Sequence, residues 1–267
     1  MAVNLVCIGD VVGSPGRQVL RDALPGLIAA RAVDCAIVNA ENAAQGSGLT
    51  PELYKKVMNA GANLITLGDH IYRRGEIIPL LESRDNIVRP ANFPAQAPGK
   101  EFAIFDTARG PRVAVISLMG RQYMKVPVNC PFAAADRVLR QIPSDVKIIV
   151  VDMHAEATSE KIAMGWHLDG RVSVIFGTHT HIPTADERIL PKGTAYISDV
   201  GMTGPYDSVL GRSKTAVLSS LISSVPARYE VAEGDVRMCG VFITVDQTTG
   251  RALSIERIRV DAGPIST

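Results

Sequence analysis

The sequence VSVIFGTHTH covers residues 172–181 and joins a short apolar run to two histidines. Val172–Phe176 predicts a buried strand, and Gly177 marks the point where the strand gives way to a loop. If the backbone stays extended, the i, i+2 spacing directs the imidazoles of His179 and His181 to the same side. Neutral imidazole is a common metal ligand. The alternative is a pair of surface or satisfied core histidines, and the H-x-H pattern alone does not separate the two.

Apolar runs alternate with helical patterns through the first half of the chain. Strands are predicted at residues 4–8, 34–39 and 63–67, and helices at 19–31, 51–60 and 75–83. Thr50 followed by Pro51 is a typical helix start, because the threonine hydroxyl caps the helix and proline suits its first position. This β-α-β-α-β order predicts a parallel sheet flanked by helices.

The second half of the chain favours antiparallel pairing. A hairpin is predicted from strands at 101–106 and 112–117, a helix at about 132–141, and buried strands at 147–152 and 172–176. Strands at 194–198, 239–245 and 252–260 are expected to be antiparallel. Together these elements predict an α/β fold in which two mixed sheets pack face to face and helices flank both, an α/β/β/α sandwich. No repeat or linker interrupts the sequence, so residues 1–267 are expected to form one domain.

Composition and charge narrow the class of protein. The 267 residues are 46% hydrophobic and 21% charged, with a formal net charge of +1, which is typical of a soluble globular protein. This balance gives no support for a long nucleic acid or a membrane as partner, whereas a small phosphorylated ligand needs only a local site. The four cysteines are widely spaced, and the N-terminal segment lacks the basic and apolar regions of a secretion signal. We therefore expect a reduced, cytoplasmic protein.

Polar side chains follow five of the predicted strands where each strand ends. In open α/β folds, ligands bind beyond these carboxyl ends. The candidates are Asp10, Glu41, Asn42, Asp69, His70, His154, His179 and His181. Each has an ordinary explanation when taken alone, as a turn cap, a solvated loop residue or a core histidine. Their repetition at five strand ends predicts one shared metal site.

The types of candidate ligand narrow the choice of metal. Histidines mixed with carboxylates, without a thiolate, suit Zn, Mn, Fe or Ni rather than a structural zinc or an iron–sulfur cluster. Apart from His70, the seven candidates are too many for one ion and suit two ions about 3.5–4 Å apart with a bridging carboxylate. Such a pair generates hydroxide at neutral pH and clamps the oxygens of a displacement at phosphorus.

Six motifs occur in an order that resembles a known family. They are Gly9–Gly13 (GDVVG), Asn39–Ala44 (NAENAA), Gly68–His70 (GDH), Asp152–Lys161 (DMHAEATSEK), Gly177–His181 (GTHTH) and Asp199–Gly204 (DVGMTG). This order is similar to that of the calcineurin-like metallophosphoesterases, and more closely to their YmdB-type branch of bacterial cyclic-nucleotide phosphodiesterases. The resemblance covers nearly the whole chain and implies the metallophosphoesterase fold.

The resemblance also implies a role for each candidate residue. Metal 1 would be held by Asp10, Glu41, Asn42 and His181, and metal 2 by Glu41, Asp69, His154 and His179. Glu41 would then bridge the two ions. His70 would be the proton donor, a role that suits a side chain whose pKa lies near neutral pH. Family members carry iron (Fe²⁺/Fe³⁺) in some structures, with Mn²⁺ supporting activity, and Zn²⁺ is an alternative.

Two positions depart from the family pattern. The family has asparagine where this chain has Asp69, and valines follow Asp10, so the histidine of the common D-x-H pair is missing. When ionised, Asp10, Glu41 and Asp69 together carry a charge of −3, against −2 with asparagine. We hypothesise that Asp69 shifts the metal preference towards a harder or more highly charged ion, such as one Fe³⁺.

Hydrolysis of a phosphodiester is the function that these motifs favour. The resemblance implies that the substrates are small 2′,3′-cyclic nucleotides, with 3′,5′-cyclic nucleotides as a further class, and metal-bound hydroxide is the expected nucleophile. The alternatives are a phosphomonoesterase or nuclease on the same centre, and a regulatory protein that binds a metal or nucleotide and hydrolyses weakly. The oligomeric state stays open, with a homo-oligomer as one outcome.

Several neighbouring residues allow more than one interpretation. The Gly13–Gly16 segment is either a loop that approaches phosphate or a turn that feeds the next helix. Arg17 is either a phosphate contact or part of a solvated helix surface. We expect His167 to lie in a loop outside the metal motifs, and Thr180 to act as a spacer between the two histidines.

Overall fold

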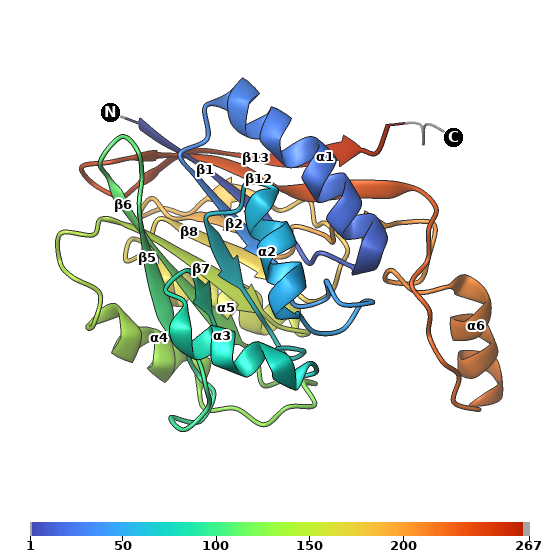
Figure 1. Ribbon diagram of the computed structural model, residues 1–267. Coiled ribbons are helices and arrows are strands. Elements are labelled where there is room, and N and C mark those ends of the chain that lie inside the picture. The colour runs from blue at the N-terminus through green and yellow to red at the C-terminus, as the bar shows by residue number, and fades with distance from the viewer. Residues whose placement is uncertain (1, 264–267) are drawn as a thin grey trace.

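Two β-sheets pack face to face at the centre of the protein, and helices cover their outer faces (Figure 1). The computed structural model describes residues 2–263. The first sheet has the strand order β11-β12-β1-β2-β3-β4, with β13 paired to β12. Its strands are β1 (Ala2–Ile8), β2 (Cys35–Asn39), β3 (Leu64–Thr66), β4 (Ile87–Val88), β11 (Gly204–Pro205), β12 (Val236–Asp246) and β13 (Ala252–Asp261).

The second sheet has the order β5-β6-β7-β8-β10-β9. Its strands are β5 (Phe102–Asp106), β6 (Arg112–Met119), β7 (Ile148–His154), β8 (Val174–Thr178), β9 (Arg188–Ile189) and β10 (Ala195–Ile197). The helices are α1 (Gly13–Arg31), α2 (Pro51–Asn59), α3 (Ile78–Ser83, after a 3₁₀ turn at Gly75–Ile77), α4 (Pro131–Leu139), α5 (Thr158–Leu168) and α6 (Lys214–Ser223). This architecture confirms the predicted sandwich of two mixed sheets.

Alternating side chains of the central strands build separate apolar layers. In β1, Val6 and Ile8 belong to the layer shared with α1 and α2, whereas Leu5 and Cys7 belong to the layer between the two sheets. Successive residues of a strand point to opposite faces, so a strand covered on both sides must be apolar at nearly every position. This explains why the central strands appear in the sequence as continuous apolar runs.

The pairing of the late strands differs from the prediction. The strand expected at 194–198 was predicted to be antiparallel, but β10 runs parallel to β8 and antiparallel only to the short β9. Residues 179–194 form a crossover long enough for parallel pairing without a helix. The predicted hairpin of β12 and β13 is confirmed, and β12 joins the first sheet by pairing with β1.

The structure moves the start of one predicted helix and adds a helix that was not predicted. Helix α1 begins at Gly13 rather than at residue 19, so Gly13–Gly16 is its first turn and not a free loop. A Cβ at Gly16 would lie 2.2 Å from the Thr203 carbonyl oxygen, so this turn packs by backbone contact and carries no apolar pattern. Helix α5 was missed, and His167 lies within it. Its buried Glu160 and Lys161 interrupt the apolar periodicity on which helix prediction depends.

Helix α6, which was also not predicted, projects from the body of the protein (Figure 1). Val217 is buried, whereas the side chains of Leu221 and Ile222 are mostly exposed. Within residues 2–263, no helix is both long enough and apolar enough to span a bilayer.

Glu101 joins the segment after β4 to α4 through two arginines. Arg89 Nη2 lies 3.2 Å from Glu101 Oε1, Arg137 Nη2 lies 3.0 Å from the same oxygen, and Arg89 is buried. Partial burial raises the pKa of Glu101, but the two guanidinium groups lower it by more than burial raises it. The pKa therefore lies below its usual value. A lowered carboxyl pKa contributes stability at neutral pH that is lost as pH falls through that pKa.

We therefore expect Glu101→Gln to lower the free energy of unfolding at pH 7 by about 1 kcal/mol or less, or about 2–4 °C in Tm. The difference from wild type should shrink below about pH 4, where the carboxyl group of the unfolded wild-type chain becomes protonated and the stabilisation begins to be lost. Thermal unfolding at pH 7 and pH 3.5 checks this, with Glu82→Gln on the exposed surface of α3 as the control. An equal Tm difference at both pH values would contradict the assignment.

Candidate metal centre

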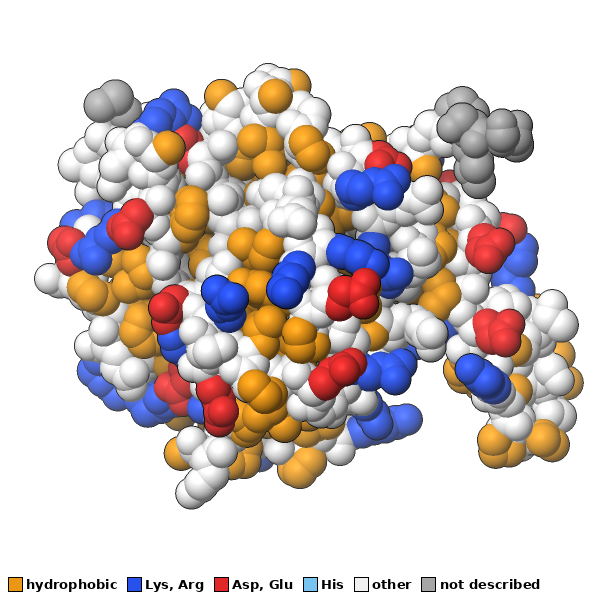
Figure 2. Space-filling model, in the orientation of Figure 1, with side chains coloured by type: hydrophobic (Ala, Val, Ile, Leu, Met, Phe, Trp, Pro, Cys, Tyr) orange, Lys and Arg blue, Asp and Glu red, His pale blue; other side chains and the backbone are white. Residues whose placement is uncertain are grey.

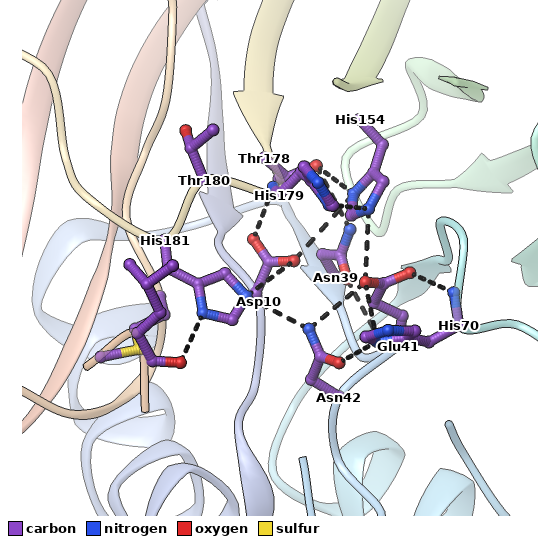
Figure 3. Close-up of polar contacts among 12 residues, drawn as sticks. Asp10, Asn39, Glu41, Asn42, His70, His154, Thr178, His179, Thr180 and His181 are labelled. Atoms are coloured by element: carbon purple, nitrogen blue, oxygen red, sulfur yellow. Dashed lines mark hydrogen bonds and ion pairs between the residues drawn. The ribbon is translucent and has the colours of Figure 1, made fainter. Parts of the chain in front are cut away.

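The candidate side chains meet where the carboxyl ends of central strands from both sheets come together. Figure 3 shows this region and labels every candidate except Asp69. Loops that follow the first sheet's β1, β2 and β3 supply Asp10, Glu41, Asn42, Asp69 and His70. The second sheet supplies His154 from the end of β7, and His179 and His181 from the loop after β8. The structure thus brings all eight predicted residues into one polar cluster.

Four of these groups form the tightest part of the cluster. Ligand atoms of Glu41, Asp69, His154 and His179 all lie within 4.8 Å of one another, a spacing that could hold a metal ion. His154 Nε2 lies 3.1 Å from Asp69 Oδ1 and 3.3 Å from Glu41 Oε1, and His179 Nδ1 lies 3.4 Å from Asp69 Oδ1. These are the four residues that the family resemblance implies for metal 2.

Asp10, Asn42 and His181 lie on the other side of Glu41. His181 Nε2 is 3.8 Å from Asp10 Oδ1 and 3.2 Å from Asn42 Nδ2, which in turn donates to Glu41 Oε1 at 3.3 Å. Asp10 Oδ1 is buried and has no hydrogen-bond partner within residues 2–263. Because a buried carboxylate oxygen is rarely left unpaired, this atom fits a cation that shares the pocket with His181.

Asn42 is oriented differently from what a metal ligand requires. Its Oδ1 lies 2.6 Å from His70 Nδ1, and its amino group faces His181 and Glu41. The NH2 group of a side-chain amide is a hydrogen-bond donor only and cannot coordinate a cation. Coordination by Asn42 therefore requires a half-turn of the amide that exchanges the positions of its oxygen and nitrogen.

The backbone of the histidine pair is not extended, which corrects the premise of the H-x-H prediction. Strand β8 ends at Thr178, and the φ angles of His179 and His181 are +89° and +65°. Positive φ is uncommon for residues with a Cβ and costs free energy. The bend turns His179 towards Asp69 and His154, and His181 towards Asp10 and Asn42.

A buried hydrogen-bond chain orients His154, and sequence reasoning assigned no role to its members. Thr178 Oγ1 donates to Asp152 Oδ1 at 2.6 Å and lies 2.8 Å from His154 Nδ1. Because the Thr178 hydroxyl uses its only proton to bond to Asp152, it must accept a hydrogen bond from His154 Nδ1–H. The lone pair of His154 Nε2 then faces Glu41 and Asp69. Asp152 also accepts from Thr66 Oγ1 and Asn39 Nδ2, and burial raises its pKa to about 6. The D-x-H spacing of Asp152 and His154, on one face of a strand, was the available signal.

Opposite charges share the buried cluster. Burial alone would raise the pKa of Asp69, but the hydrogen bonds to His154 and His179 hold it well below its usual value. Burial alone would lower the pKa of His154, whereas the carboxylates of Glu41, Asp69 and Asp10 raise it well above normal. The carboxylates therefore favour a cation at this position, and a metal ion would release a proton from His154 when it binds.

Two residues border the cluster on its solvent side. The His70 ring is about one quarter exposed, its backbone N–H donates to Glu41 Oε2 at 3.1 Å, and its Nε2 lies 3.6 Å from Asp69 Oδ2. Glu156, which the sequence interpretation left without a role, places Oε2 3.2 Å from His179 Nε2. This contact leaves His179 Nδ1 as the nitrogen directed at the cluster.

The remaining sequence candidates lie outside the cluster or support it. Arg17 Nη1 donates to the Ala43 carbonyl oxygen, so its role is to hold the loop that carries Glu41. His167 Nε2 contacts Asp136 Oδ1 at 3.0 Å between α5 and α4. Thr180 donates to Asp199 Oδ2 at 2.6 Å, so it is more than a spacer.

The two-sheet sandwich with this cluster at its carboxyl edge is the architecture of the calcineurin-like metallophosphoesterases. A sequence profile described as YmdB-like protein matches residues 6–258. A Bacillus subtilis (strain 168) protein named 2′,3′-cyclic-nucleotide 2′-phosphodiesterase is 45% identical over 259 residues, which cover 97% of each chain. The chain therefore belongs to the YmdB-like family.

Solved structures support the same fold. A Thermus thermophilus protein described as hypothetical superposes with a TM-score of 0.91 at 39% identity, over 98% of this chain and 100% of that one. A Mycoplasma pneumoniae protein described as a novel phosphatase gives a TM-score of 0.91 at 33% identity, over 98% and 94% of the two chains. The predicted family resemblance is thus confirmed.

Because Gly68 has no side chain, it leaves room for the side chains of the cluster. A Cβ at this position would lie 2.3 Å from His154 Nε2 and 2.5 Å from Glu41 Oε2. We expect Gly68→Ala to displace both side chains and to lower metal affinity about 10–100-fold, the range typical of groups that orient ligands. Metal content per chain by elemental analysis, together with Tm, measures the effect. Gly75→Ala is the matched control, because a Cβ there meets no heavy atom within 4 Å; wild-type metal content in Gly68→Ala would contradict the prediction.

Proposed function

We propose that this protein is a metal-dependent phosphodiesterase that hydrolyses 2′,3′-cyclic nucleotides through a two-metal centre. The observation that carries the proposal is the placement of Glu41 between two groups of ligands. His154, His179 and Asp69 lie on one side, and Asp10 with His181 on the other. The name of the Bacillus subtilis relative supports the class of substrate.

The donor set fits two ions that share Glu41. Metal 1 would be held by Asp10, Glu41, Asn42 and His181, and metal 2 by Glu41, Asp69, His154 and His179. Imidazole and carboxylate ligands suit Fe or Mn²⁺, with Zn²⁺ as the alternative. When bound, such ions supply a nucleophile at neutral pH and neutralise charge that develops on the phosphoryl oxygens.

His70 is the proton donor of the proposal. Its Nδ1 lies 2.6 Å from Asn42 Oδ1. After the half-turn of the amide that coordination by Asn42 requires, the amide NH2 would donate to Nδ1, and the ring proton would lie on Nε2. Nε2 lies 3.6 Å from Asp69 Oδ2, at the edge of the cluster that would hold metal 2. In hydrolysis of a cyclic phosphodiester, His70 would protonate the departing ribose oxygen.

The surface supports a small substrate rather than a long nucleic acid. On the face shown in Figure 2, lysines and arginines are interspersed with acidic side chains. The formal net charge is only +1. Strong binding to a polyanion depends on many clustered cations, because each neutralised phosphate contributes to affinity. Hydrolysis of 3′,5′-cyclic nucleotides is a further proposed activity of the same centre.

Turnover of 2′,3′-cyclic AMP by protein loaded with Mn²⁺ or Fe²⁺ tests the proposal. Bis-p-nitrophenyl phosphate and p-nitrophenyl phosphate, assayed in parallel, separate a phosphodiesterase from a phosphomonoesterase. A chelator should abolish turnover, and added metal should restore it. Metal-loaded protein that hydrolyses none of these substrates would remove the enzymatic function and favour a regulatory role.

Two variants distinguish the proposed role of Glu41 as a bridging ligand from that of His70 as the proton donor. Glu41→Gln should lower metal content below two equivalents and reduce activity by at least about 100-fold, because even groups outside the ligand set contribute 10–100-fold to metal affinity. His70→Ala should keep its metal and lose about 10²–10⁴-fold in kcat, the usual contribution of a general acid. Elemental analysis beside steady-state kinetics distinguishes the two effects. Full activity in Glu41→Gln would exclude this centre.

Asp69 offers a test of the metal preference. Asp69→Asn lowers the ligand charge from −3 to −2, so it should weaken metal binding and make the nucleophilic water more acidic. The acid limb of the pH–rate profile should then shift to lower pH, and the iron content relative to manganese should fall. Identical metal content and identical pH–rate profiles for wild type and variant would disprove the hypothesis.

A further inference from the structure

A buried ion pair lies directly behind the segment that carries His179 and His181. Lys161 Nζ, from α5, is 2.9 Å from Asp199 Oδ2, and the two side chains are only 2% and 1% exposed. Removing two charges from water is costly, so a buried ion pair of this kind adds little net stability. Neither residue belongs to the candidate ligand set, and the position of the pair points to a role in conformation.

The ion pair holds Thr180 by its side chain and its backbone. Thr180 Oγ1 donates to Asp199 Oδ2 at 2.6 Å, and the Thr180 N–H donates to the same oxygen at 3.2 Å. Lys161 Nζ donates to Thr180 Oγ1 at 3.2 Å. The other oxygen of Asp199 accepts from the Gly201 N–H at 2.8 Å, which orients the carboxylate. Figure 3 shows the Thr180 side chain directed away from Asp10 and Glu41.

Backbone contacts anchor the same segment from both ends. The Val200 N–H donates to the Gly177 carbonyl at 3.0 Å, and the Met202 N–H donates to the His181 carbonyl at 3.0 Å. A Cβ at Gly177 would lie 1.7 Å from the Ser198 carbonyl oxygen, so the two segments touch at their backbones. Thr180 is therefore held midway between two fixed points.

This anchoring determines the directions in which the imidazoles of His179 and His181 point. His179 and His181 both adopt positive φ, a conformation that a short exposed loop would not keep without support. In it, His179 Nδ1 lies 3.1 Å from His154 Nε2, while His181 Nε2 lies 3.2 Å from Asn42 Nδ2. An extended backbone would instead direct both rings to one side.

We propose that Lys161 and Asp199 are positioning residues for the metal centre. Acting on Thr180, they hold the bent backbone that sends His179 to one half of the centre and His181 to the other. The inference rests on the two-metal site of the proposed function. It extends that site to an ion pair that touches neither metal nor substrate.

Removal of the Thr180 hydroxyl tests the inference directly. Thr180→Val keeps the shape of the side chain, whereas Thr180→Ser keeps the hydroxyl. We expect Thr180→Val to weaken Mn²⁺ binding about 10–100-fold and Thr180→Ser to restore it to within about 3-fold of wild type. Binding isotherms on metal-stripped protein, followed by the electron paramagnetic resonance of free Mn²⁺, measure this without recourse to activity.

Thr107→Val is the matched control, because it removes a threonine hydroxyl that donates to the Pro111 carbonyl in the β5–β6 hairpin. It should bind Mn²⁺ as wild type does. The Tm of metal-free Thr180→Val should stay close to that of metal-free wild type. A Thr180→Val protein with wild-type Mn²⁺ affinity would overturn the inference, as would a loss of affinity that Thr107→Val shares.

A double variant tests the ion pair itself. Lys161→Met combined with Asp199→Asn removes both charges without leaving one of them buried and unpaired. We expect the metal-free double variant to unfold near the wild-type temperature and to bind Mn²⁺ at least about 10-fold more weakly. A lower Tm with unchanged Mn²⁺ affinity would show that the pair only stabilises the fold. Wild-type protein that binds no metal would instead remove the proposed function, and the inference with it.

Discussion

Mutual repulsion among three carboxylates is the constraint on which the rest of the site depends. Asp10, Glu41 and Asp69 converge on a few ångströms of largely buried space, where unscreened negative charge is costly. Imidazole groups offset part of this charge, as the raised pKa of His154 shows. Asp10 Oδ1 accepts no hydrogen bond from the described residues, although His181 Nε2 lies 3.8 Å away, so protein groups offset its charge only in part. A site of this kind is suited to bind cations.

The two sheets make different contributions to the cluster. Loops of the first sheet bring the carboxylates and the amide of Asn42, whereas the second sheet brings three imidazoles. Neither sheet alone supplies all of the candidate ligands, so the cluster exists only where the sheets are packed together. Metal binding should therefore stabilise the packing of the two sheets, because a ligand that binds only the folded state shifts the folding equilibrium towards it.

Polar networks in the second sheet determine how its imidazoles are presented. Thr178 links His154 to Asp152 at the end of β7, and Thr180 links the histidine turn to Asp199. Both threonines belong to the GTHTH motif, and they alternate with its histidines. The motif thus combines histidines that face the cluster with threonines whose hydroxyls donate to buried carboxylates behind it. Gly68 complements it from the first sheet by leaving room for His154 and Glu41.

The two-sheet α/β fold and the residues that gather in the cluster could be predicted from the sequence alone. Apolar runs show which strands are buried, and polar residues at their ends must meet at one edge. Three features could be seen only once the chain was folded: how β10 pairs, the bent backbone of His179 and His181, and the position of Lys161 beneath them. These features depend on contacts between residues far apart in the chain, and periodicity reports only which face of its own element a residue occupies.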